Sequence, residues 1–158
     1  MTLQYIPERL SDGTYTMKIM SKDKFGNKSK DEYLLDFEVI NESSISNFYP
    51  YPNPVVDKMK FVFTLTGDRI PDKMKIQILS TSGKVVREIL KEELGSIKIG
   101  NNVSDFTWDG TDMFGDRLAK GVYFYKVYLQ DSSTEYKHRF TKGDAYFKNS
   151  IGKIYLIK

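Results

Sequence analysis

The sequence contains no cysteine and a single histidine, His138, among its 158 residues. The lack of cysteine excludes disulfide bonds, thiolate nucleophiles and zinc sites with cysteine ligands. No stretch approaches the run of about 18 apolar residues that a transmembrane helix requires. The N-terminus, MTLQYIPERL, also lacks the basic and apolar regions of a signal peptide. Two alternatives follow: the protein is cytoplasmic, or Met1 begins a fragment of a longer exported protein, and the rest of the chain favours the second.

A dominant charge is missing as well. Lysine and arginine number 24 and aspartate and glutamate 21, which gives a net charge of +3 spread along the chain. Because no lysine run alternates with aromatic residues, the sequence predicts solvated strand faces and not a nucleic-acid groove. Aromatic residues, by contrast, are abundant, with 11 Tyr and 10 Phe. Flat rings pack well on pleated surfaces, so this composition favours β-sheets.

Helical periodicity is nearly absent and is weakly present only at residues 86–94. Short segments of alternating apolar and polar residues recur instead, separated by turn residues, at 14–20, 32–40, 58–65, 73–79, 85–90, 121–129, 136–141 and 152–158. Two further short strands are expected at 96–99 and 103–108, with a turn at 100–102 between them. Evenly spaced short strands of this kind predict an all-β, antiparallel β-sandwich.

Residues 108–129 form the segment around which this sandwich is expected to be organised. Its strand places apolar residues on both faces, with Val122, Phe124 and Tyr128 on one and Tyr123, Tyr125, Val127 and Leu129 on the other. A strand of this type belongs in the middle of a sheet that a second sheet covers on one side. The strand is preceded by a predicted structural turn built from Trp108, Asp109, Gly110, Asp112 and Gly115.

The chain is expected to divide into three parts. Residues 1–40 read as a hairpin with one apolar face, which is marginal alone in water. The hairpin must pack on the rest of the chain or be the end of a preceding domain, and the second interpretation is preferred. Residues 41–48 read as a linker and residues 49–158 as a β-sandwich domain. Three prolines at alternate positions, Pro50, Pro52 and Pro54, exclude a helix or a central strand at the domain entrance. This entrance is interpreted as a rigid segment whose tyrosines cover the end of the sandwich, with a ligand for an aromatic-lined groove as the alternative.

Little in the sequence points to catalysis. His138 with Ser132 or Ser133 lacks a nucleophile elbow and an oxyanion hole, so the histidine is predicted to be a surface residue. The carboxylates of Asp109, Asp112 and Asp116 could bind calcium, but their spacing fits no EF-hand loop, and turn formation is the preferred interpretation. The sequence therefore predicts no catalytic residue, no metal site and no cofactor.

An ordered series of motifs carries a family resemblance. The series is Tyr51-Pro-Asn-Pro54, Gly83-Lys-Val-Val, Gly100-Asn, Trp108-Asp-Gly-Thr-Asp112, Gly115 and Gly121-Val-Tyr-Phe-Tyr-Lys126. Over residues 49–158 it resembles the FlgD-like immunoglobulin-like domain and, more closely, the C-terminal sorting domain of proteins exported by the Bacteroidetes type IX secretion system. The hairpin before it resembles the last strands of an immunoglobulin-like or fibronectin-like domain.

The resemblance implies a non-catalytic immunoglobulin-like sandwich at the end of a secreted, cell-surface protein. Outer-membrane secretion and attachment proteins, a PorV-like shuttle and a PorU-like sortase, would be its partners, and a cut, if one occurs, would fall in residues 41–47. The implied recognition residues are Tyr51, Pro52, Asn53, Pro54, Gly121, Val122, Tyr123 with the rest of the strand to Lys126, and Gly152, Lys153, Ile154, Tyr155, Leu156, Ile157 and Lys158.

The last strand is apolar almost to its final residue, which predicts that it docks in a sheet and leaves an edge that a partner can read by strand addition. Residues 131–150 depart from the family pattern as an insertion. The alternative function is a structural or adhesive module that binds a protein or glycan through exposed aromatic residues.

Overall fold

The computed structural model describes residues 10–28, 32–132, 135–144 and 147–158. The chain divides into two compact units, Met1–Asn41 and Glu42–Lys158. Regular structure in the described residues consists of β-strands and two short 3₁₀ helices, so the predicted all-β class is confirmed. None of the helices in this described part is long and apolar enough to cross a membrane.

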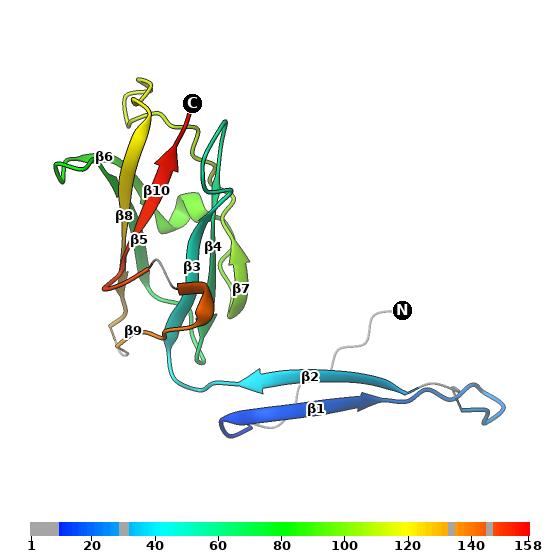
Figure 1. The fold of residues 1–158 in the computed structure, drawn as a ribbon. Helices are drawn as coiled ribbons and strands as arrows, with labels where there is room; N and C mark the ends of the chain where they lie inside the picture. Colours follow the sequence, from blue (N-terminus) through cyan, green and yellow to red (C-terminus); the bar gives the residue numbers. More distant parts are fainter. Residues whose placement is uncertain (1–9, 29–31, 133–134, 145–146) are drawn as a thin grey trace. The chain divides into compact units, whose positions relative to one another are not determined.

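The first unit contains one antiparallel hairpin, β1 (Gly13–Ile19) and β2 (Tyr33–Val39), close to the predicted bounds (Figure 1). The register places Tyr15 opposite Phe37, and their rings stack with centroids 5.8 Å apart. Apolar residues therefore share one face of the hairpin, as predicted. Much of this face is exposed, since Leu35 keeps 44% of its accessible surface.

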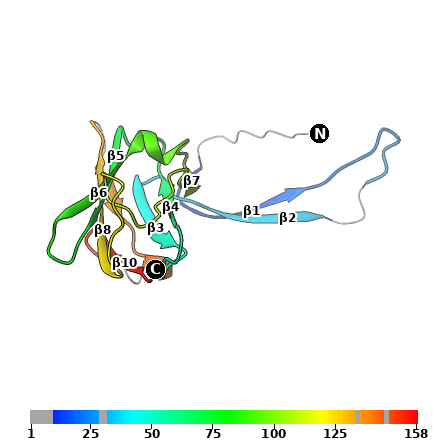
Figure 2. The ribbon, with the colours of Figure 1, turned by 90° about the horizontal axis from the view of Figure 1, so that it is seen from above.

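The second unit is a sandwich of two four-stranded sheets (Figures 1 and 2). One sheet has the order β7-β4-β3-β9, with β3 (Ser44–Tyr51), β4 (Lys60–Thr66), β7 (Gly100–Val103) and β9 (Lys137–His138). The other has the order β10-β8-β5-β6, with β5 (Lys73–Leu79), β6 (Val85–Leu90), β8 (Gly121–Gln130) and β10 (Ile151–Leu156). Neighbouring strands run antiparallel except for β3 and β9. The 3₁₀ helices are η1 (Lys91–Leu94) and η2 (Lys142–Asp144).

The core lies between the sheets and is filled by the alternate residues that the sequence pattern marks as inward. Phe48 lies at its centre and is fully buried. Its ring centroid is 5.2–5.6 Å from those of Phe61, Phe63, Tyr125 and Phe147. Burying a side chain of this size stabilises a fold by about 1.5–3 kcal/mol, so the aromatic cluster contributes much of the stability of the sandwich.

Strand β8 lies in the middle of its sheet, between β5 and β10, as predicted. Its inward residues Tyr123, Tyr125 and Val127 are buried against the second sheet. Tyr128 points the other way and is 39% exposed. Although β8 carries apolar residues on both faces, one face lies in the core and the other is partly exposed to solvent.

The predicted linker at 41–48 is wrong, because residues 44–48 belong to β3. The polar residues Ser43, Ser44 and Ser46 are buried, and the Ser44 hydroxyl forms a hydrogen bond of 2.7 Å with that of Thr66. These serines are therefore polar because they form hydrogen bonds inside the fold, and not because they face solvent. The expected cut at 41–47 falls partly within this buried strand for the same reason.

Pro50 also lies within β3, opposite Phe61 on β4, although the prolines were expected to exclude a central strand. The exclusion fails because Pro50 has no partner strand on its other side: β9 pairs only with Ser44 and Ile45. Two residues before Pro50, the amide of Phe48 points away from β4, towards Asp144. The missing amide hydrogen of Pro50 lies on that same outer side, so it removes no bond to β4.

Three shorter predictions also differ. The turn expected at 100–102 lies in β7, and the strands expected at 96–99 and 103–108 do not form. The buried Asn102 side chain explains this, since its amide donates to the carbonyls of Lys98 and Gly100 and its oxygen accepts the amide of Lys98. The strand expected at 136–141 is reduced to the two residues of β9.

Candidate functional site

The Tyr51–Pro54 motif and the last strand meet at the edge of the β10-β8-β5-β6 sheet. The Asn53 side-chain amide donates to the carbonyl of Lys153 at 3.0 Å, and the amide of Tyr155 donates to the Asn53 side-chain oxygen at 2.9 Å. A neighbouring strand would make this same pair of bonds. One asparagine side chain therefore takes the place of a strand beside β10.

Val55 continues this pairing along β10. The Val55 amide donates to the carbonyl of Tyr155 at 2.7 Å, and the Val55 carbonyl accepts the amide of Ile157 at 3.0 Å. Val55 itself is fully buried and forms a parallel bridge with Leu156. The start of β10 is paired too, because Ile151 exchanges two backbone bonds with Lys148.

The expectation that the last strand docks in a sheet is therefore correct, but the expected open edge for strand addition is not. On the side of β10 that faces away from β8, the Lys153 carbonyl and the Tyr155 amide are bonded to Asn53, and the Tyr155 carbonyl is bonded to Val55. Ile157 also differs from expectation, because it lies past the end of β10 and is 52% exposed. A partner at this edge would have to recognise side chains.

The structure brings all three predicted recognition segments together. In β8, Gly121 lies opposite Leu156 and Val122 opposite Tyr155. The three segments therefore lie side by side along one sheet, in the order Tyr51–Pro54, β10, β8. Their exposure differs: Tyr51 is 68% exposed and Tyr155 43%, whereas Tyr123 is buried. Buried members of the predicted set stabilise the fold, and only exposed members are available to a partner.

A groove of about 460 Å³ lies beside this junction. Its floor consists of three buried rings, those of Phe48, Tyr125 and Phe147. Its rim consists of Tyr49, Pro50, Asn53, Pro54, Gly143, Lys153 and Tyr155. The rim thus contains two residues of the proline motif and two of the last strand, and the junction and the groove form one continuous surface.

The floor of the groove is held by the hydroxyl of Tyr125, which donates to the Phe48 carbonyl at 2.9 Å. Burial, with a smaller effect of the nearby Asp144 carboxylate, raises the pKa of Tyr125 far above its ordinary value. Gly152 lies opposite Tyr125, and a Cβ atom built on it would be 2.2 Å from the tyrosine ring. Gly152 was predicted as a recognition residue, and its contacts are those of a packing residue.

Residues 137–144, which belong to the expected insertion, close the outer side of β3. Asp144 is fully buried and accepts hydrogen bonds from the backbone amides of Asn47, Phe48 and Thr141, each at 3.0 Å, and from the Thr141 hydroxyl at 2.7 Å. Burial by itself would raise the pKa of Asp144, but the hydrogen bonds from the Thr141 hydroxyl and from these amides outweigh it and lower the pKa. These residues of the insertion are therefore part of the sandwich.

His138 is not the surface residue that the sequence predicts. Its side chain is 12% exposed, with Nε2 3.4 Å from the Asp144 carboxylate. The rings of Phe140 and Phe147 lie 4.5 and 4.6 Å away, and they cover the histidine. The Ser132 hydroxyl donates to Asp72 at 2.9 Å, so it is engaged elsewhere, and Ser133 lies outside the described residues.

The turn before β8 is built around a buried tryptophan. Trp108 is 1% exposed, and its indole nitrogen donates to the carbonyl of Thr111 at 2.8 Å. Gly110 and Gly115 have φ angles of 81° and 88°, in the region that favours glycine. The turn also touches the last strand, because a Cβ atom on Gly110 would lie 3.1 Å from the Leu156 side chain.

The aspartates of this turn bind backbone groups. Asp109 accepts hydrogen bonds from the amide and hydroxyl of Thr111, and the hydroxyl bond lowers the pKa of Asp109 despite partial burial. Asp112 accepts the amides of Phe114 and Asp116, both at 2.9 Å. Over the described ranges, no group of three or more His, Cys, Asp or Glu side chains is placed to hold a metal ion.

Comparison with known families agrees with this geometry. The model of the FlgD Ig-like domain matches residues 53–133. The chain belongs to the FlgD Ig-like domain family. The match runs from Asn53 to just past the end of β8, so β3 and β9 of one sheet and β10 of the other lie outside it.

Among solved structures, the FlgD Ig-like chain is similar to dimeric latent PorU from Porphyromonas gingivalis, with 19% sequence identity and a TM-score of 0.44. The similarity covers 78% of this chain and 11% of that one. A comparison with curated proteins gives no match.

Proposed function

We propose that this FlgD Ig-like chain is a non-catalytic part of a larger secreted protein, and that its second unit directs export and cell-surface attachment through a type IX secretion system. A PorV-like shuttle and a PorU-like sortase would be its partners, and residues 1–40 would be the last strands of a preceding immunoglobulin-like domain. The observation that carries the proposal is the pairing of Asn53 with β10. It supports a single recognition surface built from motifs far apart in the chain.

The surface would be recognised through its side chains. Tyr51, Lys153 and Tyr155 are exposed around the junction, and the groove beside them has an aromatic floor. Exposed aromatic residues around a hollow are typical of protein interfaces. A transport receptor that contacts side chains of both segments would bind only when the first motif and the last strand are folded together.

Any proteolytic cut would fall at Asn41 or Glu42. Within the window 41–47, the buried stretch begins at Ser43, whereas Glu42 is exposed. A protease requires an extended, accessible segment, so the serines of β3 are poor substrates.

An export assay tests the proposal. The full chain is fused to the C-terminus of a fluorescent protein that carries a signal peptide, and the fusion is expressed in a bacterium with an intact type IX system and in one without it. We expect surface or medium fluorescence only with the intact system. Periplasmic retention in both strains would contradict the proposal.

Surface variants then locate the signal. The triple variant Tyr51→Ala, Lys153→Ala, Tyr155→Ala is expected to abolish export, and Phe114→Ala, which removes an aromatic side chain that is 83% exposed in the turn, is the matched control. Unfolding curves of the purified chains show whether both variants are folded. Normal export of a folded triple variant would exclude the junction as the signal.

Exposed aromatic residues also favour a second candidate, a structural or adhesive module that binds a protein or glycan. Tyr51 at 68% and Phe114 at 83% exposure are the residues concerned. In this case the chain would bind a surface glycan or protein, and the export assay would be negative in both strains. Binding lost in Tyr51→Ala but retained in Tyr128→Ala would place the contact at the junction.

A further inference from the structure

The outer face of the β10-β8-β5-β6 sheet is basic. Lys73 and Lys75 on β5, Lys126 on β8 and Lys153 on β10 point to this face, because the residues that alternate with them are buried or face the core. These four strands are described throughout, and they contain a single acidic residue, Glu88 on β6. The lysines lie far apart in the chain and come together only in the sheet.

Strand register arranges three of these lysines in an oblique row. Lys153 lies opposite Phe124, two residues from Lys126, and Lys126 lies opposite Gln77, two residues from Lys75. Diagonal neighbours on one face of a sheet are about 7–8 Å apart. The row therefore presents cations at a regular spacing across three strands, and Lys73 extends it along β5 by about 7 Å.

Two of the cations are held by one aromatic ring. The ammonium groups of Lys126 and Lys75 lie 4.8 and 5.3 Å from the centroid of the Tyr128 ring. Cations are attracted to ring faces, so Tyr128 keeps both charges close to the sheet. Lys75 also forms an ion pair of 3.3 Å with Glu88. Two lysines lie against the Tyr128 ring, which leaves less of its surface open to stack on a nucleobase.

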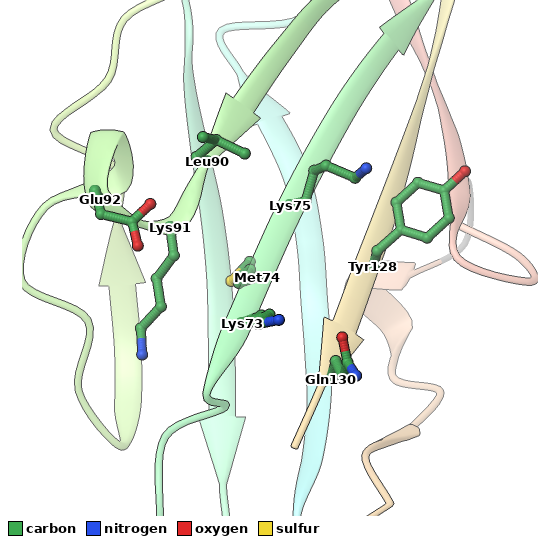
Figure 3. A pocket seen from close by; sticks show the side chains of 8 residues that line it. All are labelled: Lys73, Met74, Lys75, Leu90, Lys91, Glu92, Tyr128 and Gln130. Atoms are coloured by element: carbon green, nitrogen blue, oxygen red, sulfur yellow. The ribbon is translucent and has the colours of Figure 1, made fainter. Parts of the chain in front are cut away.

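The row leads into a shallow hollow of about 370 Å³ (Figure 3). Its lining residues are Lys73, Met74, Lys75, Leu90, Lys91, Glu92, Tyr128 and Gln130. Figure 3 shows Lys73 and Lys75 on β5 between Tyr128 on one side and Lys91 on the other. The Lys91 ammonium group donates to the carbonyl of Pro71 at 2.7 Å, which holds this cation at the border of the hollow.

We propose that this face binds an acidic polysaccharide, a chain that repeats carboxylate groups along its length. Regularly spaced cations on an open sheet suit a polymer with repeated anions, because each contact is weak and several act together. The Gln130 amide on the same face adds donors and an acceptor for sugar hydroxyl groups, and Gln77, whose amide nitrogen donates to Glu88 at 2.7 Å, adds its carbonyl oxygen as an acceptor. This face shares Lys153 with the junction at Asn53. Lys75 and Lys126 lie outside that junction, so variants of these two lysines test the present proposal separately from the proposed export function.

Binding of the full chain to polygalacturonate, with neutral dextran as the uncharged reference, tests this proposal. We expect the chain to bind polygalacturonate and not dextran. The affinity should fall steeply as the salt concentration rises, because the contacts are ionic. The double variant Lys75→Gln, Lys126→Gln should weaken binding about tenfold or more, since it removes two adjacent cations of the row. The double variant Lys75→Arg, Lys126→Arg keeps the charges and should bind normally.

Lys84→Gln combined with Lys120→Gln is the matched control. Both lysines are exposed, and they lie in the turns just before β6 and β8, outside the strands that form this face. Equal loss of affinity in this control would overturn the proposal, since the effect would then come from net charge. Equal binding to dextran, or tighter binding to single-stranded DNA or to polyglutamate than to polygalacturonate, would overturn it too.

Discussion

The Tyr125 ring lies over the backbone of Gly152, its partner in the β8–β10 ladder, where a side chain would otherwise stand. Gly152→Ala would place a methyl group 2.2 Å from this ring. We expect a destabilisation of about 1–3 kcal/mol, the usual cost of overpacking a core. Denaturant unfolding measures it, with the exposed neighbour Lys153→Ala as the control. A Gly152→Ala variant as stable as the parent chain would show that the ring does not lie there.

The Asn53 side chain is expected to protect the Tyr155 amide hydrogen from exchange. Asn53→Ala removes both bonds to β10, each worth about 0.5–1.5 kcal/mol. Hydrogen exchange at Tyr155 should accelerate, whereas exchange at Ile154, which lies in the same strand, should change less. Asn53→Asp keeps the acceptor and loses the donor, so exchange at Tyr155 should stay closer to the parent rate. Unchanged protection in Asn53→Ala would contradict the pairing.

Asp144 should make the second unit sensitive to acid. Because its pKa is lowered in the folded state, its contribution to stability is complete above its unfolded pKa of about 3.9 and is lost as the pH falls through the folded pKa. Urea unfolding between neutral and acid pH measures this. In Asp144→Asn the acid-dependent loss should shrink, with lower stability at neutral pH because the amide side chain has one acceptor oxygen for the backbone amides. Parallel pH curves for the two proteins would exclude this role.

Tyr125 should remain protonated in the folded protein at alkaline pH. Burial raises its pKa, so the unfolded state loses this proton first, and stability should fall as pH rises above about 10. Ultraviolet titration of the folded parent chain and of Tyr125→Phe should then show the same tyrosinate absorbance until unfolding begins. A lower absorbance in Tyr125→Phe before unfolding would mean that the Tyr125 hydroxyl ionises in the fold.

Most strands were predictable because alternation along a strand is a local property. β5 has the predicted bounds, and the inward residues Met74, Ile76 and Ile78 are all buried. The start of β3 and the edge strand β7 were not. Residues 44–47 and 100–102 are mostly polar, and the Ser44 and Asn102 side chains are bonded to Thr66 and to the Lys98 backbone, which the alternation pattern does not reveal.

The candidate site shows the same division. The motifs that carry the family were visible in the chain, but the hydrogen bond between Asn53 and Tyr155 joins residues 102 positions apart. His138 was read as exposed because the residues that cover it, Phe147 and Asp144, lie beyond its own strand. Lysines that appear scattered along the sequence likewise form a row only through the register of β5, β8 and β10.

The amino-acid sequence by itself determined the all-β class, most strand positions and the turn around Trp108, because backbone preference and period-two alternation act over a few residues. Only the tertiary structure decided that Asn53 and Val55 close the edge of β10, that Asp144 caps β3 and that lysines gather on one sheet face. These features depend on which strands are neighbours, and that choice is made by burial of the whole core and not by any single segment.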